Sequence, residues 1–157
     1  MYEAHIVVSE LDISGTFYEN VLGLTPTFKG DNVHFYWVGK SRKQMLGLWQ
    51  FSEENLKEQH VGEPDVSRIA HSHFAFSVSL KDFFHTIQTL KEKDIRFESF
   101  FENTSEFVVH SWMPSVSAYF SDPDGHALEV IAFLEDEPCP ELGMIPWSQW
   151  ESLHGRP

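Results

Sequence analysis

The sequence predicts an α+β protein that uses one small unit twice, each unit made of a strand, a helix and three further strands. This prediction depends on an internal repeat, because residues 5–22 resemble residues 73–90. Both segments begin with a His, and in both a Ser follows four residues later and a Leu seventeen residues later. Such a repeat indicates one supersecondary unit that is stacked on its copy, so that each buries a face the other leaves open.

The first unit begins with residues 3–8, whose alternating and partly β-branched pattern predicts a strand. Asp12 is the predicted N-cap of the helix, and Gly23 is expected to end it in a left-handed conformation. The helical face between them carries Ile13, Phe17 and Val21. Polar turns then separate three predicted strands at residues 24–29, 33–38 and 45–51.

The second unit restarts with a predicted strand at residues 71–79. Its helix has an apolar stripe made of Leu80, Phe83, Phe84, Ile87 and Leu90. Three more strands are predicted at residues 95–101, 116–121 and 127–133. The last two are joined by Asp122-Pro123-Asp124-Gly125, a turn signal because Pro presets one backbone angle and Gly accepts a positive one. We interpret these residues as turn formers and His126 as a surface or hairpin residue.

We interpret the chain as a single domain spanning residues 1–157. Its parts are a first module at residues 1–52, a linker at 53–70, a second module at 71–134 and a C-terminal tail at 135–157. Residues 102–114 form an insertion relative to the first module and are expected over a pocket mouth. In the tail, Trp147 and Trp150 lie three residues apart and are expected to dock one face of a short helix onto the domain or a partner subunit.

Composition limits the possible functions. A hydrophobic content of 41% with 22% charged residues is typical of a globular protein. The net charge of −13, without a cluster of Lys and Arg, argues against nucleic-acid binding and leaves cationic ligands possible. The single Cys139 excludes an intrachain disulfide and a thiolate zinc cluster. With neither a signal peptide nor an apolar run of about 20 residues, we expect no membrane contact and a cytoplasmic protein.

Three residues form the candidate metal site: His5 and His73, which occupy equivalent places in the repeat, and Glu129 on a later strand. Two imidazoles and one carboxylate suit Fe(II), Mn(II), Ni(II) or Zn(II) and leave positions for water and substrate. Small neighbours would leave room for a ligand, namely Ala75, Ser77 and Ala127. Taken alone, each His is also explained as a hydrogen-bonded core or rim residue, and the repeat is what favours the metal.

Other titratable residues supply acid–base candidates. Tyr119 and His110 are the candidate catalytic groups for proton transfer. His71 shares strand parity with His73 and is expected at the rim, with a supporting contact to a ligand as the alternative. The sequence has no nucleophile elbow, phosphate-binding Gly loop or Rossmann fingerprint.

Two segments resemble a known family. His5, Asp12, Phe17-Tyr18 and Val21-Leu22-Gly23-Leu24 resemble the opening of vicinal oxygen chelate proteins, and the segment YFSDPDGHALE at 119–129 resembles their closing motif. The family includes glyoxalase I, fosfomycin-resistance enzymes, extradiol dioxygenases, epimerases and bleomycin-binding proteins. The resemblance implies paired βαβββ modules forming a cupped mixed sheet, a homodimer, a small-molecule substrate, and a divalent metal at His5, His73 and Glu129.

Departures from the family pattern narrow the choice of reaction. Glyoxalase I carries a fourth ligand on the last strand of its first module. Aligning the acidic residues 53–54 with 135–136 puts Gly47 at that place, and Gly47 cannot ligate. Leu48-Trp49 is more similar to fosfomycin-resistance enzymes, and Ser117 and Tyr119 match positions near their phosphonate. Their cationic residues have no clear counterpart here, and Val7 replaces an expected hydroxyl residue.

The leading functional prediction is an enzyme in which a divalent metal chelates vicinal oxygens of a small substrate, of lyase or transferase type. An Fe(II) extradiol-type dioxygenase is the first alternative, because two His and one carboxylate also form the facial triad of such oxygenases. The second alternative is a non-catalytic protein that sequesters a cationic aromatic drug of the bleomycin type. The acidity and the 15% aromatic content favour this last possibility.

Overall fold

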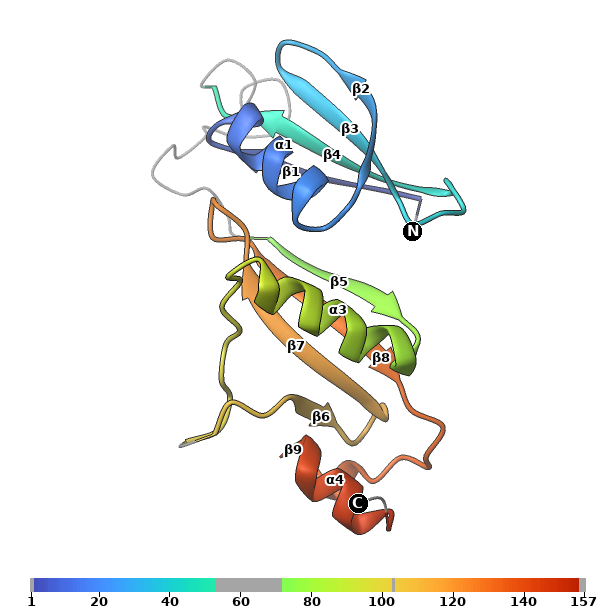
Figure 1. Cartoon of the computed structure of the whole chain (residues 1–157). Helices are drawn as coiled ribbons and strands as arrows, with labels where there is room; N and C mark the ends of the chain where they lie inside the picture. Colours follow the sequence, from blue (N-terminus) through green and yellow to red (C-terminus); the bar gives the residue numbers. More distant parts are fainter. Residues whose placement is uncertain (1, 53–71, 103, 156–157) are drawn as a thin grey trace, which may run out of the picture. The chain divides into compact units, whose positions relative to one another are not determined.

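The computed structural model describes residues 2–52, 72–102 and 104–155, and the predicted linker and His71 lie outside these ranges. The chain divides into two compact units. The first comprises Met1–Ser72 with Asp122–His126, and the second comprises His73–Ser121 with Ala127–Pro157. Each unit has its own mixed sheet, with one described helix in the first unit and two α-helices in the second (Figure 1), so the predicted α+β class is confirmed.

The first unit has the predicted element order. Its elements are β1 (Glu3–Val8), α1 (Leu11–Asn20), β2 (Thr25–Lys29), β3 (Val33–Val38) and β4 (Gln44–Gln50). The strand order is β1-β4-β3-β2, with β1 parallel to β4 and the other pairs antiparallel. Because β1 and β4 are parallel, the elements α1, β2 and β3 that connect them must return the chain to the end of the sheet at which β1 begins.

The start of α1 differs from the prediction. Its N-cap is Glu10 rather than Asp12, and the Glu10 side chain makes no capping hydrogen bond. Instead, the Leu11 N–H donates to Oε1 of Gln50 on β4 at 3.0 Å, and the Leu11 side chain is buried. A long-range side chain thus replaces the local cap that the sequence favoured. Gly23 has a φ of 70°, as predicted for the left-handed position after the helix.

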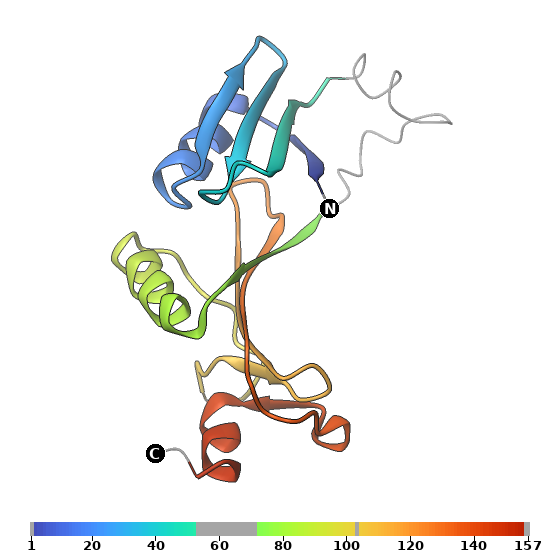
Figure 2. The same cartoon turned by 90° about the vertical axis from the view of Figure 1, so that its right-hand side faces the viewer.

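Strand alternation gives the first sheet one covered and one open face. The covered face packs on α1 and carries the buried side chains of Ile6, Val8, Tyr36, Leu46 and Leu48. Figure 2 shows α1 on one side of this sheet. The open face carries His5, which has the opposite strand parity to Ile6.

The second unit repeats this order and then extends it. Its elements are β5 (His73–Val78), α3 (Leu80–Glu92), β6 (Val108–His110), β7 (Ser115–Ser121), β8 (Ala127–Phe133), a 3₁₀ turn at Pro140–Leu142, β9 (Met144–Pro146) and α4 (Trp147–Leu153). The strand order is β5-β8-β7-β6-β9, with β5 parallel to β8. Ser79 is the N-cap of α3 and accepts a hydrogen bond from the Asp82 N–H, as expected for a Ser at this position.

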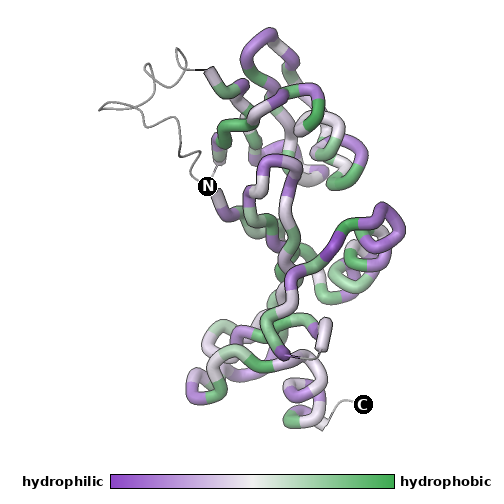
Figure 3. The backbone as a smooth tube through the Cα atoms, turned by 90° about the vertical axis from the view of Figure 1, so that its left-hand side faces the viewer, coloured by the Kyte–Doolittle hydropathy of each residue, from purple (hydrophilic) through white to green (hydrophobic). Residues whose placement is uncertain are grey.

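The helix α3 is amphipathic and covers one face of the second sheet. Hydrophobic and hydrophilic residues alternate along it (Figure 3), and Phe83, Ile87 and Leu90 are buried. The opposite strand parity defines the open face of this sheet, which carries His73 on β5 and Glu129 on β8.

The predicted strand at residues 95–101 is wrong. β7 has β8 on one side, and its neighbour on the other side is β6, which lies inside the segment predicted to be an insertion. Residues 95–101 make one backbone bond to β7, from the Glu98 N–H to the Tyr119 carbonyl at 2.8 Å. Val108 and Val109 are both buried, whereas the side chains at 98–100 are exposed. Residues 95–101 have an equally plausible strand pattern, but burial of the two valines favours β6 as the strand beside β7.

The C-terminal tail completes the second unit. β9 pairs with β6, with Ile145 opposite Val109, and α4 follows directly (Figure 2). Trp150 is fully buried and its indole N–H donates to Oδ2 of Asp136 at 3.1 Å. Docking of the tail onto the domain is thus observed for Trp150. No helix in the described ranges is long and apolar enough to cross a membrane.

The turn between β7 and β8 belongs to the first unit and corrects the interpretation of His126. This residue is fully buried, with Nε2 at 2.9 Å from the Val7 carbonyl and Nδ1 accepting from the Ser72 N–H at 3.1 Å. Asp124 accepts hydrogen bonds from the Ser9 N–H and the Ser14 hydroxyl. The turn is formed as predicted, with Gly125 at a φ of 84°. Its polar side chains also bind the end of β1 and the start of α1.

Candidate functional site

His73 and Glu129 meet on the open face of the second sheet. They lie on the neighbouring parallel strands β5 and β8, where Ala75 pairs with Glu129 and His73 pairs with Ala127. The two side chains are therefore diagonal neighbours on one face, and Nε2 of His73 is 3.0 Å from Oε2 of Glu129. Glu129 is 5% exposed, while about half of the His73 side chain is accessible. The Glu129 carboxylate thus lies inside the unit, and the His73 imidazole reaches its surface.

This pair has the chemistry and spacing of two ligands of one metal ion. With metal–ligand bonds of about 2.1 Å, two ligands at right angles are about 3.0 Å apart, and the observed separation is 3.0 Å. A buried carboxylate is costly unless it is paired or coordinated. In the described ranges, no three His, Cys, Asp or Glu side chains form a metal-binding group. The structure thus brings two of the predicted ligands together, and His5 belongs to the other unit.

Both predicted acid–base residues lie beside this pair. Tyr119 on β7 is paired with Glu129, and its ring stacks on the His73 imidazole at a centroid distance of 5.8 Å. The Tyr119 hydroxyl is 2.9 Å from Nε2 of His110, on β6. A continuous polar chain therefore runs from His110 through Tyr119 to Glu129 on the open face of the second sheet.

The environment fixes the protonation states of the two candidates near neutral pH. Burial raises the pKa of the Tyr119 hydroxyl, and the charge of Glu129 raises it further. Burial lowers the pKa of His110, against an opposing effect of the Glu129 charge. Tyr119 is therefore a protonated hydrogen-bond donor and His110 a neutral imidazole.

Three buried polar atoms on this face have no hydrogen-bond partner among the described residues. They are Nδ1 of His110, Oγ of Ser115 and Oγ of Ser117. Buried polar atoms in native proteins are nearly always satisfied by protein, water or a ligand. Their clustering next to Tyr119 therefore marks this part of the open face as a place for a polar ligand or ordered water.

The lowered pKa of His110 predicts a pH-dependent stability. A depressed folded-state pKa contributes stability that is fully present above the ordinary value of 6.5 and is lost as the pH falls through the lowered pKa. We expect the free energy of unfolding to fall less between pH 7.5 and 5.5 in His110→Gln than in wild type, measured by urea denaturation. His85→Gln, an exposed change on α3, should keep the wild-type slope. Equal slopes in wild type and His110→Gln would contradict this prediction.

His5 lies on the open face of the first sheet among aromatic rings. Its Nδ1 accepts the indole N–H of Trp49 at 3.2 Å, and its ring centroid is 5.7 Å from those of Trp49 and Phe35. Gly47 is its cross-strand partner. A Cβ on Gly47 would lie 2.9 Å from Cδ2 of His5 and 3.0 Å from Phe35, so the missing side chain makes room for both rings.

The strand register corrects the predicted correspondence between the units. His5 pairs with Gly47 and its repeat equivalent His73 pairs with Ala127. Gly47 therefore corresponds to Ala127, and Trp49 corresponds to Glu129. The predicted alignment, which put Gly47 opposite Glu129, is therefore wrong by two residues. Trp49 offers no carboxylate, so the first unit has no acid at this place.

Sequence reasoning missed one residue next to His5. Glu3 lies two residues earlier on β1, and its Oε1 is 2.7 Å from Nε2 of His5. The available signal was strand parity, since residues two apart in a strand point to the same face.

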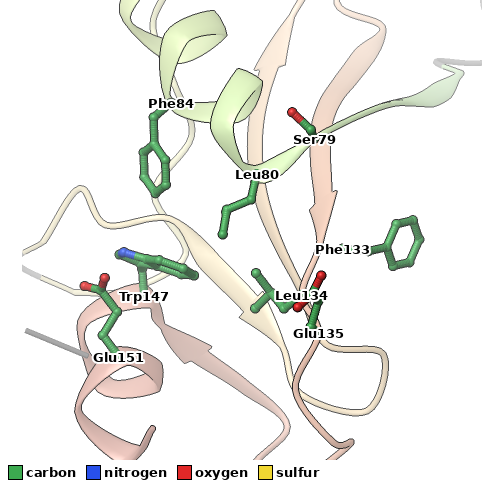
Figure 4. A pocket seen from close by; sticks show the side chains of 8 residues that line it. All are labelled: Ser79, Leu80, Phe84, Phe133, Leu134, Glu135, Trp147 and Glu151. Atoms are coloured by element: carbon green, nitrogen blue, oxygen red, sulfur yellow. The ribbon is translucent and has the colours of Figure 1, made fainter. Parts of the chain in front are cut away.

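The second unit also has a groove of about 620 Å³, bounded by α3, the end of β8 and α4 (Figure 4). Leu80, Phe84 and Trp147 form its apolar walls. None of the candidate ligands or catalytic residues lines it.

The fold and the open-face residues define a protein of paired βαβββ modules with an imidazole–carboxylate site. A model of the Glyoxalase/Bleomycin resistance protein/Dioxygenase superfamily matches residues 3–130, and the chain belongs to this family. The predicted resemblance is therefore confirmed.

Two curated relatives carry names of transferases. The chain is 30% identical to a glutathione transferase, FosA, of Serratia marcescens over 125 residues, covering 80% of this chain and 74% of the relative. It is 28% identical to a metallothiol transferase, FosB, of Staphylococcus epidermidis over 123 residues, covering 78% and 74%.

Solved structures share the fold. A lactoylglutathione lyase from Agrobacterium tumefaciens has a TM-score of 0.63 at 23% identity, covering 84% of this chain and 92% of that chain. An integron cassette protein from the mobile metagenome of a Halifax Harbour sewage outfall has a TM-score of 0.62 at 25% identity, covering 85% and 97%.

Proposed function

We propose that this protein is a divalent-metal enzyme that transfers a thiol to a small substrate bearing vicinal oxygens, with His5, His73 and Glu129 as ligands. The supporting observation is the His73–Glu129 pair, whose donor atoms are 3.0 Å apart beside Tyr119. The names of the relatives, a glutathione transferase and a metallothiol transferase, favour thiol transfer over isomerisation. Fe, Mn, Ni and Zn all suit this ligand set, and a homodimer and a cytoplasmic location are part of the proposal.

When bound, the metal supplies a Lewis acid that stabilises negative charge developing on a substrate oxygen. The protein's own groups then act on the same oxygens. Tyr119, held protonated by its raised pKa, donates a hydrogen bond to one of them. His110 fixes the direction of the Tyr119 hydroxyl through the contact at 2.9 Å. The unpaired hydroxyls of Ser115 and Ser117 provide further contacts to polar substrate atoms.

The first test of this proposal is metal content. Protein purified without a His tag should carry close to one metal ion per chain, whereas His73→Ala should carry only traces, measured by inductively coupled plasma mass spectrometry. His85→Ala removes an exposed imidazole on α3 and should retain the wild-type content. Equal trace metal in wild type and His73→Ala would end the metal proposal.

The second test concerns the reaction. Metal-loaded wild type should add a thiol, such as glutathione, to a small epoxide that bears a second oxygen on the neighbouring atom. The carbon–sulfur bond forms as the epoxide C–O bond breaks, and the thiol proton passes to the resulting alkoxide. Chelation should stop the consumption of thiol until metal is restored. Uptake of oxygen with a catechol, without thiol consumption, would instead assign ring-cleaving oxygenase chemistry to the same ligand set.

One observation favours a second candidate function, a binding protein for cationic aromatic ligands. The open face of the first sheet places Phe35 and Trp49 around His5, and aromatic faces attract cations. The net charge of −13 adds to this attraction. Tight binding of bleomycin that survives both chelation and His5→Ala would favour sequestration over catalysis.

A further inference from the structure

We propose that the groove of the second unit binds a small organic cation, a molecule that joins an ammonium or guanidinium group to an apolar body. The groove is bounded by α3, the end of β8 and α4 (Figure 4). Its volume of about 620 Å³ lies within the range of about 300–1,000 Å³ that is usual for small-molecule sites. The groove belongs to the second unit alone and is separate from the proposed metal ligands.

The apolar wall of the groove contains two accessible aromatic side chains. Phe84 on α3 and Trp147 at the start of α4 meet edge-on, with ring centroids 5.7 Å apart. Phe84 is 41% exposed and Trp147 is half-buried. The Phe107 ring contacts Phe84 at a centroid distance of 6.3 Å and supports it from within the unit. Leu80 adds aliphatic surface. Such a wall accepts a flat apolar group, and aromatic faces also attract a cation.

The charged residues of the groove are both carboxylates. Glu135 follows β8 and Glu151 lies on α4, and no Lys, Arg or His is among the lining residues. Among the residues that the structure describes, neither carboxylate takes part in an ion pair. Unpaired carboxylates beside aromatic faces complement an organic cation, because the ion pair and the cation–π contact act on the same charged group. The charge of the groove thus favours a cation over a neutral or anionic ligand.

The positive ends of two helices also border the groove, and each has a carboxylate of its own. Ser79, the N-cap of α3, lines the groove, and its hydroxyl donates to Oδ2 of Asp82 in the first turn at 2.7 Å. In the first turn of α4, the Ser148 N–H donates to Oε2 of Glu106 at 2.9 Å. These carboxylates offset the helix dipoles. The two lining carboxylates therefore determine the sign of the charge that the groove attracts.

A matched pair of probes separates the charge from the apolar body. 1-Naphthylmethylamine is a cation at neutral pH, and 1-naphthylmethanol is its neutral counterpart of nearly the same shape. In a titration of the ¹⁵N-labelled full chain followed by NMR, the amine should saturate and shift the Trp147 indole N–H signal. The alcohol should bind at least about 5-fold more weakly, because it forms neither ion pairs nor a cation–π contact. Added salt should weaken binding of the amine alone.

Two double variants test the assigned carboxylates. Glu135→Gln/Glu151→Gln keeps the shape of both side chains and removes their charges. This variant should bind the amine about 3- to 30-fold more weakly, as expected for two partly exposed ion pairs, and should bind the alcohol as wild type does. Glu137→Gln/Glu141→Gln changes the net charge equally at exposed residues outside the groove lining. It should match wild type with both probes.

Several results would overturn the proposal. Absence of saturable binding would do so directly. Equal affinity for amine and alcohol would leave apolar contact alone, and equal losses in the two double variants would assign the affinity to overall charge. His73→Ala should bind the amine normally, and loss of binding there would assign the amine to the proposed metal site. A chain that does not bind the amine and forms a dimer that Trp147→Leu dissociates, measured by sedimentation, would assign the groove to a second copy.

Discussion

Glu129→Gln is expected to abolish tight metal binding and leave the metal-free protein at least as stable as wild type. Glu129 is 5% exposed and faces the His73 imidazole at 3.0 Å. Gln has nearly the same shape and removes the negative charge that would bind the ion. We expect the dissociation constant for Co(II) to rise by more than about 100-fold, because substitution of even an outer partner of a ligand costs about 10- to 100-fold.

The stability of the metal-free variant is the more diagnostic part of this prediction. A buried carboxylate without a cation carries a desolvation cost that a neutral amide does not. Functional sites commonly hold such unfavourable groups, and their replacement stabilises the fold at the expense of activity. Urea denaturation of both proteins after chelation measures the difference. Glu137→Gln, an exposed change in the tail, is the control and should alter neither quantity. A large loss of stability in Glu129→Gln would instead assign Glu129 a structural role.

Trp150→Ala is expected to lower the free energy of unfolding by about 3–5 kcal/mol, the usual cost of removing a buried aromatic side chain. Trp150 is fully buried and is the largest such side chain among the described residues. The substitution also leaves the Asp136 carboxylate without its indole donor. The substitution destabilises the second unit, where α4 covers β9 and β6.

A matched control for Trp150→Ala lies on the same helix. Leu153 is 56% exposed, and Leu153→Ala should change stability by no more than about 0.5 kcal/mol. Chemical denaturation followed by circular dichroism suits both variants. Similar small losses for the two would show that the tail is an appendage and not part of the core.

The metal-binding prediction depends on the contact between His73 and Glu129, and the sequence predicted the shared sheet face of these two residues but not the contact itself. Strand parity put His73 and Glu129 on one sheet face, and the observed distance between their donor atoms agrees with this. Glu3 was not among the predicted site residues, although its side chain contacts the His5 imidazole. The register of β1 against β4 puts Trp49 where the second unit has Glu129.

The third strand of the second unit and the burial of His126 also depend on contacts between residues that are distant in sequence. Residues 95–101 and 108–110 have comparable strand patterns, and the choice between them is made by β7 and β9, which bury Val108 and Val109. His126 follows a turn signal that is typical of the surface. His126 is nevertheless buried: its Nε2–H donates to the Val7 carbonyl and its Nδ1 accepts from the Ser72 N–H, and neither partner is close to it in sequence.

The sequence by itself determined the two-fold repetition, the order of the elements and the faces of most strands. These properties are local, because hydrophobic periods of 2 and 3.6 residues report directly on strands and helices. Only the tertiary structure decided the register between strands, the third strand of the second unit, the burial of His126 and the pairing of Glu3 with His5. Each of these features depends on contacts between side chains that are far apart in the sequence. A local residue pattern therefore does not determine them.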